Sequence, residues 1–471
     1  LIFRSDTGTG KTTTVKHHLK ETGSRFISIV SRISLGEEQT EVFRDHGIEC
    51  NYHQELQDTI DKHNEECNGC FYNFKHFEEH EGENIIITID SLCKMEGFTD
   101  FYGYTIYLDE INSLIEHLIT SPTCAKKRAP IFSLLRKIIN EADLVIGTDA
   151  DISDNCLEVF NQLNLPYRFI DNTYKHNNSV KATEITSFEK FMKKLLKEPK
   201  FIVCADSKTI VEILGHNVFN GGEIIYCLIT SEGWKLYKGK TLIRILEKHE
   251  RKMDLYDIVL YSPKIVYGLD SIMKRPVFAY FCQQTISPVA MVQQLCRCRN
   301  ITYINFMFEP MSVRAYKYHD IDEIKDEVKA LHKLSISAFD CVEGDLKNDY
   351  MDLYSRFQYN YDCYDTNKKA HFMTILKNRG VKIAVSMLDK INTFGKDQGK
   401  KEINDMKLKD MKLLCENWLE KVVEPTRQKQ YETFMEDGLD EEDEEDIQEA
   451  VKETYEKYKD EAKDHYPEWI W

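Results

Sequence analysis

The sequence predicts an α/β protein with two α/β domains in tandem and a mainly helical C-terminal region. Through residues 1–170, short apolar runs alternate with amphipathic stretches, and a second such series begins near residue 180. This alternation is typical of strands and helices in parallel βαβ units. Beyond about residue 325, strand signals fade and helical periodicity takes over. We therefore divide the chain into residues 1–172, 173–325, a helical accessory region 326–430 and a helical or disordered acidic tail 431–471.

The individual strands are predicted from runs rich in β-branched and aromatic residues. In the first domain these runs are Leu1–Phe3, Phe26–Val30, Ile85–Ile89, Thr105–Leu108 and Leu144–Ile146. In the second domain they are Phe201–Cys204, Glu223–Leu228, Ile258–Tyr261, Val277–Phe281 and Tyr303–Phe308. Helical periodicity marks Ile321–Leu334 and Thr374–Ile391 in the C-terminal region.

Composition narrows the class of protein. Of 471 residues, 42% are apolar and 30% charged, an ordinary balance for globular domains. No apolar run approaches the ~18 residues of a membrane span, and we find no secretory signal. We therefore expect no membrane partner, an intracellular location, and reduced thiols for the 14 cysteines. The chain reaches its first motif within a few residues and lacks an initiator Met, which suggests a fragment of a longer protein.

The acidic net charge is concentrated at one end of the chain. Residues 431–471 hold 17 Asp or Glu and 4 Lys, and so carry −13 of the net charge of −17. An acidic tail is usually a solvated or interaction segment. A protein that grips a nucleic-acid backbone needs only a local basic groove, so the net charge does not exclude a nucleic-acid partner.

The strongest motif is Ser5-Asp6-Thr7-Gly8-Thr9-Gly10-Lys11-Thr12, which lies between an apolar run and a helical run. This is the setting of a P-loop, in which backbone N–H groups at a helix N-terminus surround the phosphates of a nucleotide. Lys11 would reach the β- and γ-phosphates, and the Thr12 hydroxyl would bind Mg²⁺. Ser5 stands where the usual pattern has Gly. The predicted ATP-binding residues here are Thr7, Gly8, Thr9, Gly10, Lys11, Thr12 and Thr13.

A second motif follows about a hundred residues later, where the apolar run from Tyr104 ends in Asp109-Glu110. An Asp-Glu pair after a strand is common by itself, but at this distance from a P-loop it indicates a Walker-B site. Asp109 would hold Mg²⁺ through water, and Glu110 would polarise the water that attacks the γ-phosphate.

Together these segments resemble the motifs of superfamily 2 helicases, and most closely those of the herpesvirus-type origin-binding protein family. The resemblance covers about residues 1–310, and seven motifs, together with the "DSL" segment, fall in the family's order. The remaining segments are 29–35 (motif Ia), 87–92 (the "DSL" segment), 147–151 (motif III), 201–208 (motif IV), 261–264 with 266–270 (motif V) and 293–299 (motif VI).

Motif VI separates a helicase from other P-loop proteins. The resemblance implies that Gln293 contacts the nucleotide side of the cleft, that Arg297 and Arg299 are candidate arginine fingers, and that Gly268 and Asp270 bind the nucleotide. The family often has Gly where Cys296 stands, and its last Arg often lies one position later. The assignment of the finger therefore stays open between Arg297 and Arg299.

By resemblance, the fold is two tandem RecA-like domains with ATP between them. The implied reaction is ATP-dependent unwinding of single-stranded or partly duplex DNA, with RNA not excluded, in viral genome replication. Its cofactors would be ATP and Mg²⁺, its partners a primase, a polymerase or a single-strand-binding protein, and its location the host cytoplasm (virus factory) or nucleus. Two alternatives remain: another P-loop ATPase (AAA+ type or phosphotransferase), or a nucleic-acid-binding module with an inactive ATPase site.

Two weaker patterns favour ordinary structural interpretations. Cys67 and Cys70, followed by His76 and His80, could supply four zinc ligands. The gap between the two pairs is shorter than the ~12–15 residues of a zinc finger, so a polar insertion is favoured. The aromatic residues of the C-terminal region could stack bases, but their spacing favours a helix core; they are Tyr354, Phe357, Tyr359, Tyr361 and Tyr364.

Overall fold

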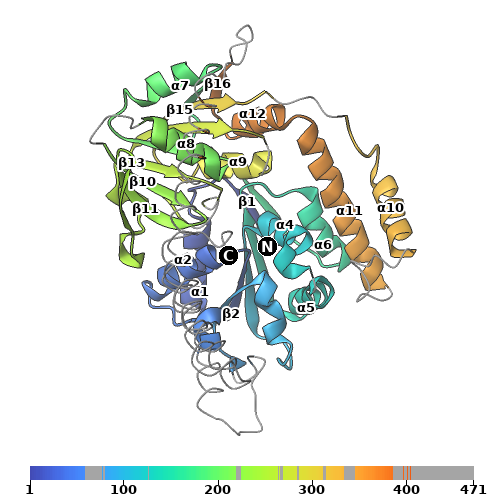
Figure 1. The fold of residues 1–471 in the computed structure, drawn as a ribbon. Helices are drawn as coiled ribbons and strands as arrows, with labels where there is room; N and C mark the ends of the chain where they lie inside the picture. Colours follow the sequence, from blue (N-terminus) through green and yellow to red (C-terminus); the bar gives the residue numbers. More distant parts are fainter. Residues whose placement is uncertain are drawn as a thin grey trace, which may run out of the picture.

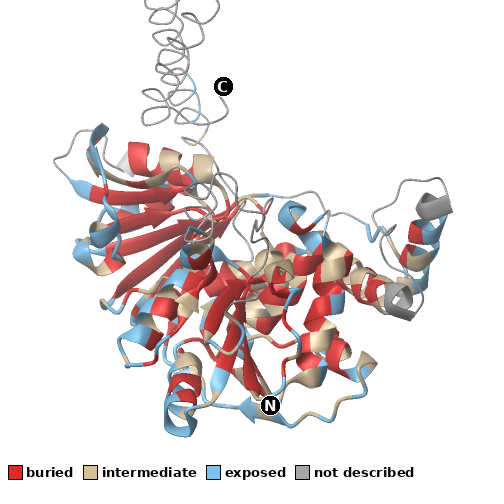
Figure 2. Cartoon of the chain, turned by 90° about the horizontal axis from the view of Figure 1, so that it is seen from below, coloured by how far each residue is buried: buried red, intermediate tan, exposed pale blue. Residues whose placement is uncertain are grey.

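The computed structural model describes residues 1–58, 77, 80–125, 127–218, 224–263, 265, 269–283, 286–310, 315–333, 345–385, 396, 400 and 404. These residues form two sheets, each flanked by helices, and further helices that run along one side of both domains (Figure 1). Buried residues follow the strands of both sheets and the inner faces of the helices (Figure 2).

The first sheet is parallel throughout, with the strand order β3-β4-β2-β5-β6-β1-β7. Its strands are β1 (Ile2–Ser5), β2 (Arg25–Val30), β3 (Asn51–Tyr52), β4 (Ile85–Thr88), β5 (Tyr104–Asp109), β6 (Leu144–Asp149) and β7 (Phe169–Asn172). Its helices are α1 (Lys11–Thr22), α2 (Ile33–Arg44), η2 (Ile89–Met95), α4 (Ile111–Thr120), η3 (Pro122–Cys124), α5 (Arg128–Glu141) and α6 (Asp154–Gln162).

Side chains alternate between the two faces of this sheet, as strand geometry requires. Phe26 of β2 packs in a core with Val15 of α1 and Phe43 of α2. Its neighbour Ile27 packs in the opposite core, to which α4, α5 and α6 contribute. Because the strands are buried on both faces, they appear in the sequence as nearly continuous apolar runs.

The second sheet has the order β12-β11-β10-β13-β9-β14-β15-β8-β16, parallel except for the antiparallel β10-β11-β12 edge. Its strands are β8 (Lys181–Glu184), β9 (Phe201–Ala205), β10 (Ile225–Thr230), β11 (Gly233–Lys238), β12 (Thr241–Ile245), β13 (Ile258–Tyr261), β14 (Arg275–Phe281), β15 (Ile301–Phe308) and β16 (Lys382–Ala384). Its helices are α7 (Phe188–Leu195), α8 (Lys208–Val218), α9 (Pro288–Leu295) and the short η4 (Lys248–Glu250) and η5 (Met253–Leu255).

The prediction of two tandem RecA-like α/β domains followed by helices is confirmed. Each strand predicted in the two series overlaps an observed strand. The prediction of a helix over Ile321–Leu334 is also confirmed by α10 (Ile321–Lys333).

The C-terminal helices join both domains. Leu353 and Phe357 of α11 (Asp345–Thr366) are buried in the core of the first domain. Phe372 of α12 (Lys368–Asn378) is buried in the second, where its ring lies 5.2–5.4 Å from those of three phenylalanines on β14 and β15. The chain therefore crosses from one domain to the other between α11 and α12.

The prediction of a continuous helix over Thr374–Ile391 is wrong. The helix ends at Asn378, and Gly380 adopts φ 84°, a left-handed conformation that terminates helices. The chain then forms β16, which pairs in parallel with β8 of the second sheet.

Three further predictions concern other parts of the chain. Cys67, Cys70 and His76 of the zinc pattern and the acidic tail lie outside the described residues, and so does Gly268 of motif V. In the part of the chain that the structure describes, no helix has both the length and the apolar character needed to cross a bilayer.

Candidate nucleotide site

The loop between β1 and α1 has the shape of an anion-binding loop. Gly8 and Gly10 adopt φ 80° and 84°, a region that side chains with a Cβ rarely occupy. Gly10 is the N-cap of α1, whose first backbone N–H groups have no partner within the helix. A Cβ at Gly10 would meet nothing within 4 Å, so the space beside it is open. Such a helix N-terminus favours phosphate.

Hydroxyl and ammonium groups stabilise this loop from inside. The Lys11 Nζ donates to the carbonyl oxygens of Ser5 (2.9 Å) and Asp6 (3.3 Å). The Thr9 hydroxyl donates to the Asp6 carbonyl oxygen at 2.6 Å. Thr7 is buried, whereas Thr13 is exposed on α1. The positively charged ammonium of Lys11 is thus held inside the loop, where it can donate hydrogen bonds to phosphate oxygens.

Asp109 ends β5 and is held on both carboxylate oxygens. Its Oδ1 accepts from the Thr148 hydroxyl (2.9 Å) and from the Glu110 backbone N–H (3.1 Å), and its Oδ2 accepts from Gln39 Nε2 (2.8 Å). Burial, followed by the charge of Glu110, raises the pKa of Asp109. The Tyr107 hydroxyl connects this group to the P-loop, since it lies 3.3 Å from the Thr148 hydroxyl and 3.5 Å from that of Thr12.

Thr12 and Asp109, the two predicted Mg²⁺ residues, thus lie on one side of the sheet and are linked through two hydroxyls. A hydroxyl and a carboxylate are the hard oxygen donors that Mg²⁺ prefers. The donor set therefore fits the ion.

Glu110 is set apart by its backbone and by one free oxygen. It is the N-cap residue of α4 and adopts φ 52°, a strained conformation for a residue with a side chain. Its Oε2 is buried and accepts no hydrogen bond from any residue in the described ranges. Burial, followed by the charge of Glu110, raises the pKa of the neighbouring Asp149 well above its usual value. A buried carboxylate oxygen without a donor is suited to hold a polarised water.

The end of β6 and the two residues after it, residues 147–151 or motif III in the sequence, are tied to the same site. Asp149 accepts from the backbone N–H groups of Asn112 (2.8 Å), Ala150 (2.6 Å) and Asp151 (3.1 Å). The preceding Thr148 donates to Asp109. Movement of this segment would therefore be transmitted to the Walker-B strand.

The two arginines of the second domain follow α9 and share one carboxylate. Arg297 Nη1 donates to Asp270 Oδ1 at 3.1 Å, and Arg299 Nε donates to Asp270 Oδ2 at 2.8 Å. The Arg297 side chain is only 5% exposed. Although burial acts in the opposite direction, Asp270 and then Glu110 raise the pKa of Arg297, which places its charge within electrostatic range of the Walker-B glutamate. Asp270, a predicted nucleotide-binding residue, holds both arginines in this structure.

The second domain meets the P-loop directly. A Cβ built on Gly8 would lie 3.5 Å from Arg299 Cδ and 3.7 Å from Arg299 Nη1. His176 lies in residues 173–180, the interdomain linker between β7 and β8. It joins the same groups, because its backbone N–H donates to Asp6 Oδ2 (3.3 Å) and its Nε2 lies 2.7 Å from the Arg299 carbonyl oxygen. The structure therefore brings Arg299 to the loop that holds Lys11.

Gln293, the remaining predicted residue of motif VI, is buried on α9. Its Oε1 has no hydrogen-bond partner among the described residues. The adjacent Gln294 instead stabilises the second domain, since its Nε2 donates to the Ala205 carbonyl oxygen at 3.1 Å.

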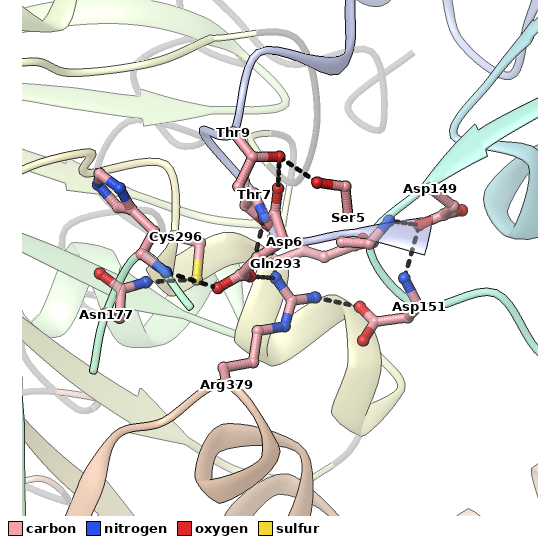
Figure 3. Close-up of polar contacts among 12 residues, drawn as sticks. Ser5, Asp6, Thr7, Thr9, Asp149, Asp151, Asn177, Gln293, Cys296 and Arg379 are labelled. Atoms are coloured by element: carbon pink, nitrogen blue, oxygen red, sulfur yellow. Dashed lines mark hydrogen bonds and ion pairs between the residues drawn. The ribbon is translucent and has the colours of Figure 1, made fainter. Parts of the chain in front are cut away.

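Three residues at this site were missed from the sequence. Gln39 of α2 links Ser28 to Asp109, and Glu38 lies within range of Asp270 and both arginines. Burial, followed by the charge of Asp270, raises the pKa of Glu38 to about 8. Arg379, at the end of α12, contacts the P-loop (Figure 3). The first two follow motif Ia on a helix, which was the available signal; Arg379 lies outside every motif.

Two cavities lie between the domains and the C-terminal helices. One of about 520 Å³ is lined by residues that include Asp6, Asp151 and Arg379, and one of about 320 Å³ by residues that include Arg32 and His117. Both share Tyr361 and Tyr364 of α11. The prediction that the aromatic residues form helix core is confirmed for Phe357, which is buried in the first-domain core, and for Tyr354 and Tyr359, which pack against it. Tyr361 and Tyr364 are partly buried and lie outside this core.

No family model and no curated protein matches the sequence. Solved structures do match the fold. The DEAD-box helicase Mss116 bound to ssRNA and UDP-BeF is 14% identical, with a TM-score of 0.46, over 80% of this chain and 82% of that one. Dbp5 of S. cerevisiae bound to RNA and ADP BeF3 is 10% identical, with a TM-score of 0.44, over 86% of this chain and 88% of that one. Helicase Lhr of Mycobacterium smegmatis bound to ssDNA and AMP-PNP is 13% identical, with a TM-score of 0.43, over 77% of this chain and 53% of that one.

Proposed function

We propose that the protein is a nucleic-acid-dependent ATPase that moves along or unwinds its substrate. The observation that carries the proposal is the position of Arg299, which reaches from the second domain to Gly8 of the P-loop in the first. A P-loop enzyme with its whole site in one domain has no need of such a contact. With phosphate held by one domain and arginines supplied by the other, hydrolysis and domain movement become coupled.

The predicted residues of the first domain have places in the proposed reaction, ATP plus water to ADP plus phosphate. Lys11 and the backbone N–H groups of residues 7–13 would hold the phosphates. Thr12 and Asp109 would hold Mg²⁺, which when bound neutralises phosphate charge. Glu110 would accept the proton of the attacking water as the bond between the γ-phosphorus and its bridging oxygen breaks.

The arginines would act by exchanging partners. In this structure Asp270 accepts from both Arg297 and Arg299. Phosphate oxygens would compete for the same guanidinium groups, because they form equally strong bidentate bonds. Asp270 would thus retain the arginines beside the loop until the triphosphate is bound.

We propose that the nucleic-acid strand lies in the 320 Å³ cavity between the domains and α11. Arg32 and His117 contribute from the first domain, Pro263 from the second, and Tyr361, Tyr364 and Lys368 from the C-terminal helices. Cationic groups suit the backbone, and tyrosine rings suit stacking of bases. Because both domains form its walls, movement of the domains would alter the cavity.

We extend the proposal to DNA and to viral genome replication. The support is the "DSL" segment at residues 87–92 and the short Arg-x-Arg form of motif VI, both of which resemble the origin-binding branch. The protein would then act with a primase, polymerase or single-strand-binding protein in the host cytoplasm or nucleus.

Steady-state ATP hydrolysis, measured with and without single-stranded DNA or RNA, tests the central proposal. We expect stimulation of at least about tenfold by nucleic acid and its loss in Lys11→Ala. A constant rate without stimulation would favour an AAA+ type ATPase or phosphotransferase instead. No hydrolysis at all would favour a binding module with an inactive ATPase site.

Strand displacement on tailed duplexes tests the finer proposal. DNA duplexes with 3′ or 5′ single-stranded tails are compared with RNA duplexes of the same sequence. Displacement of DNA but not RNA supports the replication role, whereas displacement of RNA alone contradicts it and leaves the ATPase proposal intact.

A further inference from the structure

Arg379 belongs to the second domain but reaches into the first. It follows α12, whose Phe372 is buried in the second-domain core, and precedes β16 of the second sheet. Gly380, which turns the chain here, packs against the interdomain linker, since a Cβ on it would lie 3.1 Å from the Asn178 Cα. The backbone of Arg379 is thus held by the second domain and the linker.

The guanidinium group bridges two separate segments of the first domain (Figure 3). Its Nη1 donates to Asp6 Oδ1 (2.8 Å) and to the Thr7 hydroxyl oxygen (2.6 Å), both in the P-loop. Its Nη2 forms an ion pair with Asp151, in the segment after β6. The Arg379 side chain is 5% exposed and that of Asp6 is 1% exposed. Charges so deeply buried interact strongly with their partners, because little water screens them.

These contacts lie where the linker joins the domains. Asp6 also accepts from the His176 backbone N–H, and Asn172 Nδ2 donates to the Ser5 hydroxyl oxygen at 2.9 Å. Arg379, the P-loop and the linker therefore meet at one point, close to the contact between Arg299 and Gly8. A change in the Arg379 contacts would alter the orientation of the second domain relative to the P-loop.

We propose that Arg379 is a positioning residue: it anchors the P-loop and the segment after β6 to the second domain, and so sets where Arg297 and Arg299 lie relative to Lys11. Both of its Nη groups are bound to first-domain side chains, so it acts through these residues rather than on phosphate. The inference deepens the proposed ATPase function and rests on it.

A simpler role would be charge balance, and the two roles can be separated. Removal of Arg379 leaves two unpaired carboxylates beside the phosphate site, Asp6 buried and Asp151 partly buried, which repel a triphosphate. Neutralising all three groups, in the triple variant Arg379→Met/Asp6→Asn/Asp151→Asn, removes that repulsion without restoring the bridge. Charge balance predicts full recovery in the triple variant, whereas positioning predicts recovery of nucleotide binding alone.

The experiment compares this triple variant with Arg379→Met and Arg379→Lys. The matched control is Arg136→Met, because Arg136 pairs with Asp349 of α11 at 2.5 Å and also ties the C-terminal helices to the first domain, away from the P-loop. Nucleotide affinity is measured by titration with the fluorescent analogue mant-AMP-PNP, and basal ATP hydrolysis gives kcat and KM. Pulsed electron resonance between spin labels, introduced through non-natural amino acids at exposed Glu21 and Lys190, reports the distance between the domains.

For Arg379→Met we expect the nucleotide Kd to rise and kcat to fall, each by at least about tenfold. The triple variant should regain a Kd within about threefold of wild type, while kcat stays at least about tenfold low and the interdomain distances stay broadened. Arg379→Lys keeps the positive charge, but its single ammonium group cannot bridge Asp6 and Asp151 as the guanidinium group does. The variant should therefore retain nucleotide affinity and lose kcat by about 3–10-fold. Arg136→Met should change none of these by more than about twofold.

Recovery of kcat and of a narrow distance distribution in the triple variant would overturn the inference, and so would an Arg379→Met variant that behaves as wild type in all three measurements. The interdomain distance measurement tests the proposed role of Arg379 even if ATP hydrolysis is undetectable. Nucleic-acid stimulation of the wild-type protein is assayed separately, so a failure of the motor proposal is distinguishable from a failure of the role of Arg379.

Discussion

Arg299 lies against Gly8: a Cβ on this P-loop glycine would be 3.5 Å from the arginine Cδ, an ordinary van der Waals contact. The two residues belong to different domains and are 291 positions apart in the numbering. The loop that would bind phosphate is therefore also in contact with an arginine of the second domain. This contact satisfies the geometric requirement of a nucleotide site shared between two domains.

The first prediction concerns the backbone of this loop. Gly8→Ala adds a Cβ at φ 80°, which costs about 1–2 kcal/mol in the left-handed region and favours a different loop conformation. We expect the Kd for mant-AMP-PNP to rise at least about tenfold, because the N–H groups no longer converge.

Gly23→Ala is the matched control. Gly23 ends α1 at φ 61° with open space beside it, so the backbone strain is similar but lies outside the loop. Gly23→Ala should lower the melting temperature and leave the nucleotide Kd unchanged. Equal effects of the two variants on Kd would contradict a specific role for the loop conformation.

The second prediction concerns the arginine pair. Arg297→Ala or Arg299→Ala should reduce kcat for ATP hydrolysis by about 10³-fold for the residue that contacts the γ-phosphate in the transition state, and by less for the other. Steady-state rates at saturating ATP make the comparison and identify the finger. The control is Arg244→Ala, because the exposed Arg244 side chain pairs with Glu250 on the same domain. If both single variants retained wild-type kcat, the assignment of motif VI would be wrong.

Much of the fold was predictable because the central strands are buried on both faces. Strands such as β5 and β13 are continuous apolar runs with polar ends, so their positions were clear. Six strands were missed, β3, β7, β8, β11, β12 and β16, and three of them carry a weak signal. β7 and β12 are largely exposed edge strands, and β16 has only three residues. Such strands form because a neighbouring strand offers unpaired backbone groups, a tertiary effect that hydropathy does not record.

The candidate site was predictable only where a motif is local. The P-loop and the Asp109-Glu110 pair each occupy one turn at a strand end, so spacing alone located them. Arg379 and Asp6 are 373 positions apart, and their contact depends on how α12 packs on the second domain. Gly380 was a local signal for the helix end, but the periodicity that continues beyond it led to the wrong helix.

The third prediction tests whether α11 is an integral part of the first domain. Leu353 is fully buried in that domain's core, close to the edge-to-face pair of Phe132 and Tyr350. Leu353→Ala should cost about 2–5 kcal/mol of unfolding free energy, because it removes apolar contacts and leaves a cavity. Urea unfolding followed by circular dichroism measures this. Leu255→Ala, at a 59% exposed leucine, should cost little, and equal losses in the two variants would contradict the docking of α11.

The fourth prediction concerns Glu38, which interacts electrostatically with Asp270 and the two arginines of the second domain and with Asp109 of the first, and whose pKa burial raises to about 8. In the unfolded chain this carboxyl has its usual value near 4.5. Between these two pH values the folded protein keeps a proton that the unfolded chain has released. The contribution of Glu38 to stability is therefore fully present below pH 4.5. It decreases with rising pH, by at most about 1.4 kcal/mol per pH unit, and does not change further above pH 8.

Glu38→Gln removes this titration while keeping the shape of the side chain. Relative to wild type, the variant should become steadily more stable between about pH 5 and pH 8.5, where ionised Glu38 would face Asp270 and Asp109. Melting temperatures of both proteins at constant ionic strength across this range measure the difference. Glu37→Gln, at the exposed neighbouring position on α2, should have the same pH dependence of melting temperature as wild type. Melting curves of Glu38→Gln and wild type that stay parallel across this range would show that the cleft does not hold Glu38 in its protonated form.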